Sequence, residues 1–312
     1  MKKLFITGAT GCVGHYIIEQ LLGIPDTELH LLVRKPERLR VPKDQQTNII
    51  FHVGNMEFIE KHADVIREMT HVIHIATDWS DSEYATLLNV EKTHFMFNAV
   101  DPEKCEKIVY FSTASILGPN NKAIPEAGKY GQGYVRSKYK AYMSLKECIC
   151  YDRIITVFPT LVFGGDESHP GSHISDGIGP NRHYLKWLRF IYPEGALHFL
   201  HAKDIATTSL YFLFNEMPKN EYVLGMNKVT GKAVIETVCR IFGVRMLFRF
   251  KVTSAFIIKV ASLLKITIGP WEKHCIENPY MVYDTVNPST FGKPVAFPDL
   301  TTLLTDIKSR VI

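Results

Sequence analysis

The segment from Lys3 to Gln20 constrains the fold more than any other part of this chain. Its sequence, KLFITGATGCVGHYIIEQ, starts with a short apolar run, continues with three glycines at a spacing of three, and ends with apolar residues at helical intervals. This order predicts a buried strand, a tight turn and a helix. Gly8 would form the turn, Gly11 would let the backbone approach a pyrophosphate, and Gly14 would let the helix pack closely on the strand. A phosphate would then bind the N–H groups of the helix N-terminus.

Apolar segments alternate with helical patterns over the first half of the chain. Strands are expected at residues 28–33, 49–53, 71–76, 107–112 and 154–158, and helices at 57–69, 83–100 and 134–150. This alternation predicts an α/β fold with a doubly wound parallel sheet covered by helices on both faces. In that setting the glycine turn is interpreted as a phosphate-binding loop rather than as a turn that binds nothing.

The length of 312 residues predicts two lobes. Residues 164–179 are rich in glycine and histidine and lack periodicity, so a smaller C-terminal substrate-binding lobe is expected at 164–312, with a mobile loop over the ligand cleft. Residues 1–163 would form the dinucleotide-binding domain, to which a helix at 204–214 and a strand at 221–225 would return. Beyond Thr230 we expect two helices, a loop around 270–279 and a terminal helix from Pro298.

Composition excludes several classes of function. The formal charge is +4 and no lysine-rich block is present, which argues against a nucleic-acid partner and suits an anionic ligand. The six cysteines are scattered without metal-site spacing, and the N-terminus enters a strand without a signal-peptide pattern, so a cytoplasmic protein with reduced thiols is expected. The apolar stretch 255–268 is too short to span a membrane and contains Lys259 and Lys265; a helix of the substrate lobe is favoured over an interfacial anchor.

Hydroxyl and amine groups follow the fifth expected strand. Ser112 and Thr113 end that strand, at the carboxyl edge where ligands of parallel sheets bind. Tyr134 and Lys138 are four residues apart on an expected helix, so their side chains share one face. A nearby ammonium favours the phenolate, and we therefore expect a lowered pKa for Tyr134. A strand-end hydroxyl can also be a simple cap, and Tyr-x-x-x-Lys occurs by chance in many helices.

Taken together, these segments resemble the extended short-chain dehydrogenase/reductases, the branch that includes nucleotide-sugar epimerases and dehydratases. The resemblance covers nearly the whole chain and rests on the segments TGATGCVG, HVIHIAT, Asn89 in LLNVEKT, FSTASILG, YVRSK, FPTLVFG, HAKDIA and the late Phe291-Gly292. It implies an NAD(P)-dependent enzyme acting on a small-molecule substrate, with a homodimer left open.

The resemblance also implies residue roles. Thr113 corresponds to the catalytic hydroxyl, Tyr134 to the proton donor, and Lys138 to the lysine that tunes the tyrosine and holds the cofactor ribose. The cofactor-binding positions it implies are Gly8, Thr10, Gly11, Cys12, Val13, Gly14, Arg34, Lys35, Asn55, Met56, Ala76, Thr77, Lys138 and Pro159. Val33 stands where an NAD site needs a carboxylate, and Arg34 and Lys35 follow, so NADP(H) is the expected cofactor and NAD(H) the alternative.

Departures from the family pattern bear on the substrate. Leu117 replaces the usual tyrosine, Asn55 an aspartate, and Lys92 a common glycine. Ala114 and Ser115 stand where 4,6-dehydratases carry the Asp-Glu pair that eliminates water, so this reaction is not expected. No arginine lies between residues 271 and 291, where sugar-nucleotide members commonly bind the pyrophosphate, which makes such substrates less favoured.

Three functions stay open at this point. They are net hydride transfer, epimerisation with return of the hydride, and cofactor binding without turnover; the intact Thr113, Tyr134 and Lys138 argue against the last. No metal is expected, because His173, His183, His198 and His201 lack metal-site spacing. Asp204 is interpreted as a cap or structural contact, and Trp187 with the aromatics around Phe190 as packing of the second lobe.

Overall fold

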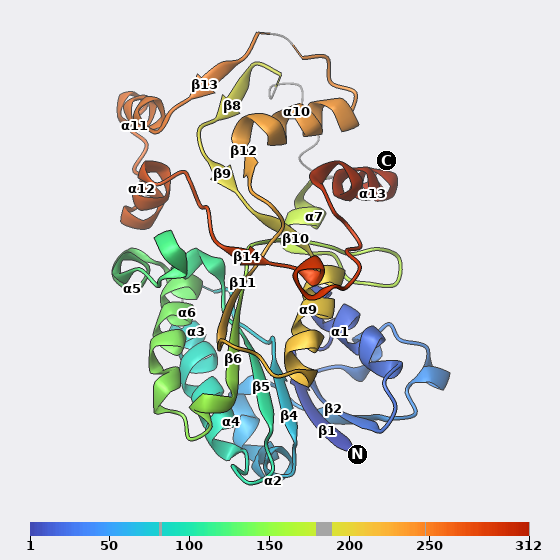
Figure 1. The fold of residues 1–312 in the computed structure, drawn as a ribbon. Coiled ribbons are helices and arrows are strands. Elements are labelled where there is room, and N and C mark those ends of the chain that lie inside the picture. Colours follow the sequence, from blue (N-terminus) through green and yellow to red (C-terminus); the bar gives the residue numbers. More distant parts are fainter. Residues whose placement is uncertain (81–82, 179–188, 247, 312) are drawn as a thin grey trace.

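An eight-stranded parallel sheet forms the centre of the computed structural model, which describes residues 1–80, 83–178, 189–246 and 248–311 (Figure 1). The strand order is β14-β11-β6-β5-β4-β1-β2-β3. The strands are β1 (Lys2–Thr7), β2 (Thr27–Val33), β3 (Ile49–Val53), β4 (His71–His74), β5 (Lys107–Phe111), β6 (Ile154–Pro159), β11 (Glu221–Leu224) and β14 (Thr285–Val286). The order reverses between β1 and β4, so the predicted doubly wound sheet is confirmed. The sequence did not predict the edge strand β14.

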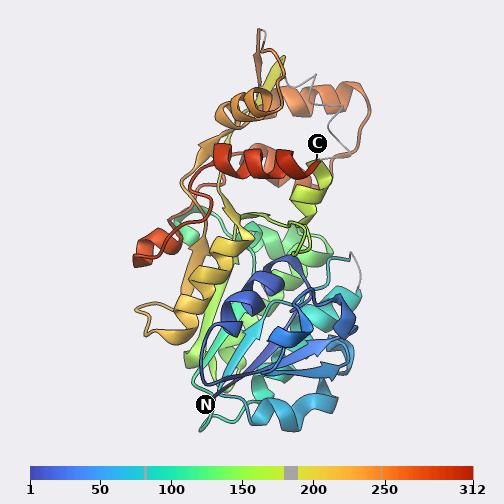
Figure 2. The same ribbon diagram turned by 90° about the vertical axis from the view of Figure 1, so that its right-hand side faces the viewer.

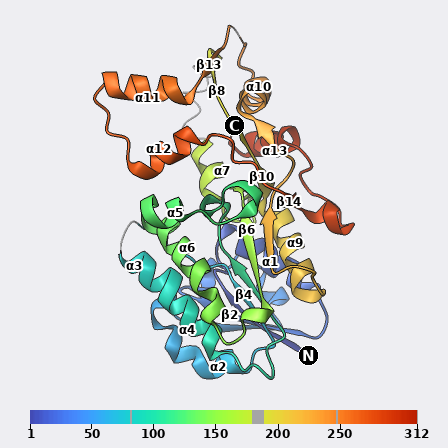
Figure 3. The same ribbon diagram turned by 60° about the vertical axis from the view of Figure 1, so that its left-hand side comes forward.

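Helices cover both faces of this sheet (Figures 1 and 3). Leu4 and Ile6 of β1 pack in the core beneath α1 (Cys12–Leu22) and α9 (Ala202–Phe214), whereas Phe5 points into the opposite core. Strand side chains alternate between faces, so three consecutive apolar residues supply both cores. The opposite face carries α2 (Ala63–Arg67), α3 (Glu83–Thr86), α4 (Thr93–Ala99) and α6 (Gly133–Ser144), with α5 (Pro125–Tyr130) packed on α6.

Three expected helices are shorter or less regular than their patterns suggested. The helix expected at 57–69 is a 3₁₀ helix over Met56–His62 followed by α2, with non-helical backbone at Phe58. The helix expected at 83–100 changes from α3 into a π-helical segment, Leu87–Lys92, and then into α4. Helix α6 ends at Ser144, and a 3₁₀ turn, Leu145–Glu147, follows. A π segment often marks a functional position, and this one contains Asn89.

The remaining elements gather at the other end of the molecule. They are β7 (Leu161–Phe163), α7 (His173–Ile178), β8 (Ile191–Pro193), β9 (Ala196–Leu197), β10 (Phe199–His201), β12 (Val229–Thr230), α10 (Gly231–Ile241), β13 (Phe250–Val252), α11 (Ser254–Leu263), α12 (Pro270–Glu277) and α13 (Leu300–Val311). Figure 2 shows the red helix α13 beneath the orange helices of this end. The loop expected around 270–279 is therefore wrong: Pro270 starts α12, since proline fits the first turn of a helix.

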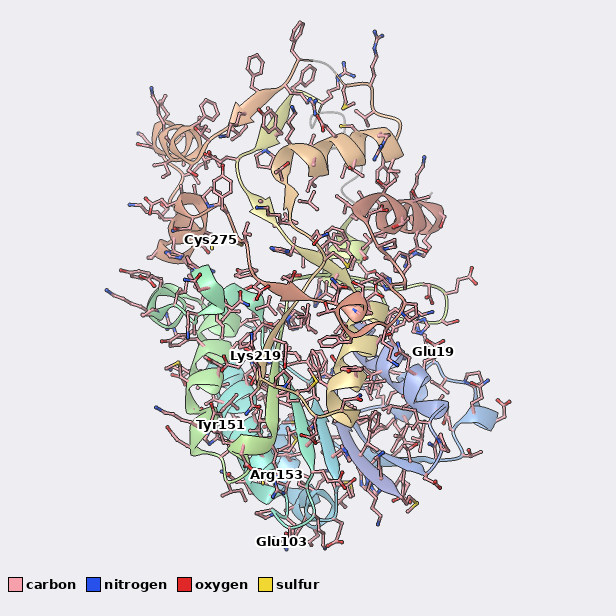
Figure 4. All side chains as sticks on the ribbon, viewed as in Figure 1. Glu19, Glu103, Tyr151, Arg153, Lys219 and Cys275 are labelled. Atoms are coloured by element: carbon pink, nitrogen blue, oxygen red, sulfur yellow. The ribbon has the colours of Figure 1, made fainter. Side chains whose placement is uncertain are left out.

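Residues 164–172, expected as part of a mobile loop, are tied to α1. The Tyr16 hydroxyl donates to Asp166 over 3.1 Å, and the His169 ring stacks on the Tyr16 ring with centroids 3.8 Å apart. His169 also lies 3.4 Å from the carboxylate of Glu19, which is labelled in Figure 4. Short-range periodicity does not reveal this anchoring, because the partners are some 150 residues apart in sequence.

His201 caps α9 in its neutral form. Its Nδ1 accepts a hydrogen bond from the backbone N–H of Lys203, and the ring is buried beside Tyr16 and Phe297. Burial lowers the pKa of His201 to about 3, with further lowering from Arg310. Protonation would place a hydrogen on the accepting nitrogen and remove the cap.

The stability of the protein should consequently fall in mild acid. The unfolded chain binds a proton at this ring below pH about 6.5, whereas the folded chain does not until pH approaches 3, so stability is full above pH 6.5 and is lost as pH falls. We expect wild type to lose roughly 2 kcal/mol more than His201→Asn between pH 7 and pH 5, measured by urea unfolding. Asparagine keeps a cap acceptor and does not titrate. Equal losses would contradict this expectation.

Candidate active site

Gly8 and Gly14 form a close-packed turn between β1 and α1. Gly8 has φ of +77°, and a Cβ there would lie 2.7 Å from the backbone nitrogen of Ala76, beyond the end of β4. A Cβ on Gly14 would lie 2.2 Å from the carbonyl oxygen of Gly8. At Gly11 the same oxygen would be 3.3 Å away, which is tight but not prohibitive. The packing thus requires glycine at the first and third positions.

The N-terminus of α1 opens beside this turn. Gly11 is the N-cap residue, and no side chain caps it. The N–H groups of the first helical turn lack intrahelical acceptors, and those of Cys12 and Val13 belong to this set. Thr10 lies half-buried in the turn itself. An uncapped helix end beside a glycine turn fits the pyrophosphate of a dinucleotide.

Basic residues follow β2 where an adenosine ribose would lie in this fold. Arg34 and Lys35 are exposed directly after the buried Val33. The backbone N–H of Arg40 donates to Nε2 of His15, so the segment after β2 is fastened to α1. Sequence reasoning missed this contact of His15, because it joins a helix to the backbone of a loop 25 residues away.

The ends of β3 and β4 border the same turn. Asn55 has a buried side-chain oxygen without a hydrogen-bond partner, and Met56 beside it is buried. A buried oxygen of this kind is costly unless a ligand donates to it, which fits a bound adenine. The backbone N–H of Ala76 donates to Thr7 Oγ1 over 3.3 Å. This hydrogen bond holds the ends of β1 and β4 together beside the glycine turn.

Asn89 fixes the segment that follows β4. Its side-chain oxygen accepts from the Thr77 hydroxyl and from the Asp78 N–H, at 3.0 and 2.8 Å. Its amide nitrogen donates to the carbonyl of Asp78 and to the hydroxyl of Ser137 on α6, both at 2.9 Å. One buried amide therefore joins the loop after β4 to the helix that carries Tyr134.

Thr113, Tyr134 and Lys138 converge at the carboxyl end of β5. Thr113 is buried, and its hydroxyl lies near enough to the Tyr134 hydroxyl to lower the pKa of Tyr134. The Thr113 hydroxyl donates to the hydroxyl of Ser115 over 3.2 Å and accepts from its N–H. Lys138 lies one helical turn after Tyr134, and its Nζ donates to the carbonyl of Phe111 over 2.7 Å. The neighbouring Ser112 hydroxyl is buried without a partner in the described structure. The structure brings together the three residues singled out from the sequence, beside the end of β6 at Pro159.

The expected lowering of the Tyr134 pKa is wrong for this structure. Burial raises the pKa of Tyr134 to about 12, and the nearby Thr113 hydroxyl opposes this only partly. Burial also lowers the pKa of Lys138 to about 7, and the amine is directed at the strand carbonyl rather than at the phenol. Desolvation disfavours both charged forms, so Tyr134 holds its proton at neutral pH.

An aromatic residue that the sequence analysis did not select covers Tyr134. The Trp79 ring stacks on the Tyr134 ring with centroids 3.9 Å apart and planes 16° apart, and His173 of α7 contacts Trp79 edge-on at 5.4 Å. Trp79 itself is 58% exposed. A tryptophan just after the fourth strand was the available signal, since that loop borders the ligand edge of the sheet.

The histidines and Asp204 have structural roles. His198 Nδ1 bonds the carbonyl of Met226, and its Nε2 accepts from the N–H of Tyr283. Asp204 accepts from the backbone N–H groups of Ala296 and Phe297, which confirms a structural contact. His183 and Trp187 lie outside the described residues. Within the described ranges no cluster of histidine, cysteine and carboxylate side chains could hold a metal ion, and all six cysteines are free.

A cavity of about 770 Å³ opens elsewhere, along the outer strands of the sheet, and no residue of the site lines it. Tyr151 and Lys219, labelled in Figure 4, belong to its lining. Both precede their strands, β6 and β11, and therefore lie near the strand ends opposite the carboxyl edge. Size alone does not make this cavity the reaction centre, because it contains none of the converging hydroxyl and amine groups.

Comparison with known proteins agrees with the fold and with the glycine turn. The family model described as NAD dependent epimerase/dehydratase family matches residues 4–225. A search of curated proteins gave no match. Among solved structures, the terminal R domain of the myxalamid PKS-NRPS pathway has a TM-score of 0.75 at 16% identity, covering 100% of this chain and 90% of that chain. The protein gox2253 gives 0.74 at 22%, covering 99% and 97%.

The Bordetella bronchiseptica enzyme WbmG, solved in complex with NAD and UDP, gives a TM-score of 0.68 at 18% identity, covering 98% of this chain and 92% of that chain. At these identities the likeness shows a shared fold. In the described part of the chain, no helix has both the length and the apolar character needed to cross a membrane.

Gly14→Ala should disrupt the turn, whereas Gly23→Ala should not. The new methyl group at position 14 would overlap backbone atoms of Gly8 and Ala9, while at Gly23, just after α1, its nearest neighbour would be the Gln20 carbonyl oxygen at 3.9 Å. We expect Gly14→Ala to lose about 1–3 kcal/mol of stability and most of its affinity for NADPH. Urea unfolding and calorimetry would measure these quantities. Similar behaviour of the two variants would count against a tight phosphate-binding turn.

Proposed function

Because this chain belongs to the NAD dependent epimerase/dehydratase family, we propose that it is an NADP(H)-dependent oxidoreductase of the extended short-chain dehydrogenase/reductase type. Its substrate would be a small molecule with a carbonyl or hydroxyl carbon, and Tyr134 would exchange a proton with the substrate oxygen. The observation that carries this proposal is the meeting of Thr113, Tyr134 and Lys138 at the carboxyl end of β5.

Each of these residues has a separate role in the proposed reaction. The bound nicotinamide supplies or accepts the hydride. Thr113 would donate a hydrogen bond to the substrate oxygen and hold it in reach of the Tyr134 hydroxyl. Lys138, buried behind the strand end, would bind a ribose hydroxyl and keep the nicotinamide in position. Trp79 would shield the Tyr134 ring from water on its stacked face.

At neutral pH Tyr134 is in the protonation state that carbonyl reduction uses. A phenol with a pKa raised to about 12 keeps its proton at neutral pH and can donate it to a carbonyl oxygen as hydride arrives at the carbon. The reverse reaction needs a phenolate, which burial disfavours. We therefore propose carbonyl reduction as the principal activity.

Epimerisation of a sugar-type substrate is the second candidate. The matching family model includes epimerases by its description, and WbmG was solved with NAD and UDP. The two activities differ in what happens to the cofactor: a reductase oxidises one NADPH per turnover, and an epimerase returns the hydride. Because Ala114 and Ser115 follow Thr113, we do not expect 4,6-dehydration.

We propose the following organisation for the chain. Residues 1–163, together with 204–225, would bind the dinucleotide, and the rest of 164–312 would bind the substrate. The contacts of α9 with β5 and β6 and the pairing of β11 with β6 support this division. The free cysteines suit a cytoplasmic protein. Gel filtration would show whether the chain forms a homodimer.

Tyr134→Phe should keep NADPH affinity and lose most turnover. Phenylalanine preserves the stacking with Trp79 and removes only the transferable proton, and positioned acid-base groups contribute typically ~10²–10⁴-fold. A panel of carbonyl compounds and nucleotide sugars would be assayed for NADPH oxidation and, separately, for epimer formation. Tyr142→Phe is the matched control, because that hydroxyl on the same helix donates to Glu221 at the surface, away from Thr113 and Lys138. Near-normal turnover in Tyr134→Phe would show that another group transfers the proton.

Arg34→Ala should erase most of the preference for NADP(H) over NAD(H). The exposed guanidinium of Arg34 after β2 can form an ion pair with a 2′-phosphate, whereas the uncharged ribose 2′-hydroxyl of NAD cannot form one. Calorimetry would compare both cofactors in wild type, in Arg34→Ala and in Arg67→Ala, whose side chain pairs with Asp64 on α2. NAD(H) affinity should hardly change. Equal affinities for the two cofactors in wild type would refute the NADP assignment and point to Asn55 as the main contact.

A further inference from the structure

The outer end of the second lobe exposes large apolar side chains to water. Phe248 is 89% exposed, Phe250 on β13 is 71% exposed, and Leu263 at the end of α11 is 74% exposed. Leu264 and Ile266 beyond that helix are also exposed. So many exposed large apolar side chains at one end of a molecule call for an explanation.

These side chains belong to elements at the end of the molecule farthest from the central sheet. Figures 1 and 3 show β13 and α11 one after the other at this end. Among the residues that the structure describes, strand β13 pairs with β8 alone, in a two-stranded sheet. A flat surface could therefore approach β13 and α11 without meeting the dinucleotide-binding half of the protein.

The exposed face of α11 combines apolar and basic residues. Phe256, Lys259 and Leu263 are spaced i, i+3 and i+7 and share one side of the helix, and all three are exposed. Ala261, the buried residue of this helix, lies on another side. A lysine on an apolar face can bury its aliphatic stem and place its ammonium group at a polar boundary.

The charge of the surrounding segment has one sign. From Thr237 to Trp271 the sequence contains six basic residues and no acidic residue. Two of the six are neutralised from outside the segment, Arg249 by Glu236 and Lys251 by Glu194, each at 2.7 Å. Among the described residues, Arg245, Lys259 and Lys265 have no acidic partner within ion-pair distance.

The sequence favoured a helix of the substrate lobe over an interfacial anchor for residues 255–268, but from the exposed side chains of this helix we infer both roles: β13, α11 and the residues that follow them form an interfacial docking surface for an anionic lipid bilayer. The exposed phenylalanine and leucine side chains would enter the boundary between headgroups and acyl chains, and Arg245, Lys259 and Lys265 would bind anionic headgroups. A second copy of the chain fits this surface poorly, because the same cations would face one another. The surface lies apart from the Thr113, Tyr134 and Lys138 site and does not depend on its reaction.

Vesicle sedimentation with the full chain tests this inference. Vesicles of phosphatidylcholine containing about 30% phosphatidylserine should bind the protein at about 0.1 M salt, and vesicles of phosphatidylcholine alone should bind it at least about tenfold more weakly. Raising the salt to about 0.5 M should weaken binding to the anionic vesicles. Equal binding to both vesicles, or binding to neither, would overturn the inference.

Paired variants separate the apolar and the ionic contributions. Leu263→Ser with Leu264→Ser, and separately Lys259→Glu with Lys265→Glu, should each weaken binding by about tenfold. Their controls are Ile149→Ser, another exposed apolar residue, and Lys146→Glu, both on the dinucleotide-binding half. All four replaced side chains on the outer lobe are exposed, so folding should persist, as circular dichroism would check.

Two further results would each refute the inference. One is that the control variants weaken vesicle binding as much as the outer-lobe variants do. The other is that the protein forms a dimer in gel filtration that Leu263→Ser with Leu264→Ser dissociates, because a second copy would then cover the surface.

Discussion

The close approach of the glycine turn to the ends of β1 and β4 is the constraint on which the site depends. Gly14 packs its α carbon against the carbonyl of Gly8, and Gly8 packs against the backbone of Ala76. No side chain intervenes, so the N-terminus of α1 is held directly over the point where the strand order reverses. This is where a parallel sheet opens between its two wings and can receive a dinucleotide. Gly8, Gly11, Gly14 and Ala76, which are proposed to bind the cofactor, take their positions from this junction.

Around that junction, side-chain hydrogen bonds join segments that are far apart in the sequence. The buried amide of Asn89 joins the loop after β4 to α6, and the Lys138 ammonium joins α6 to the end of β5. Tyr134 is thereby fixed between Thr113 and Trp79. The same burial that fixes the phenol also keeps it protonated. Position and protonation state therefore have one physical cause, the removal of these groups from water.

The second lobe differs from the central sheet in how much of its apolar surface is exposed to water. Its inner elements bury residues such as Phe199, Leu200 and Leu303. Its outermost elements leave aromatic and aliphatic side chains in water beside cations that have no acidic partner among the described residues. Exposed apolar side chains beside cations are the features that the inferred docking to an anionic bilayer would use.

The sequence alone determined the beginning of the fold and singled out the residues that are proposed to react. The apolar run before Gly8, the glycine spacing and the helical periodicity after it are local patterns, and each strand of the sheet's first half was located to within about two residues. Thr113, Tyr134 and Lys138 were found because strand ends and helical spacing place them together. Only the tertiary structure decided the direction of the Lys138 amine, the raised pKa of Tyr134, the cover by Trp79 and the addition of β14. These features arise from contacts between distant segments and from exclusion of water, and neither leaves a periodic trace in the chain.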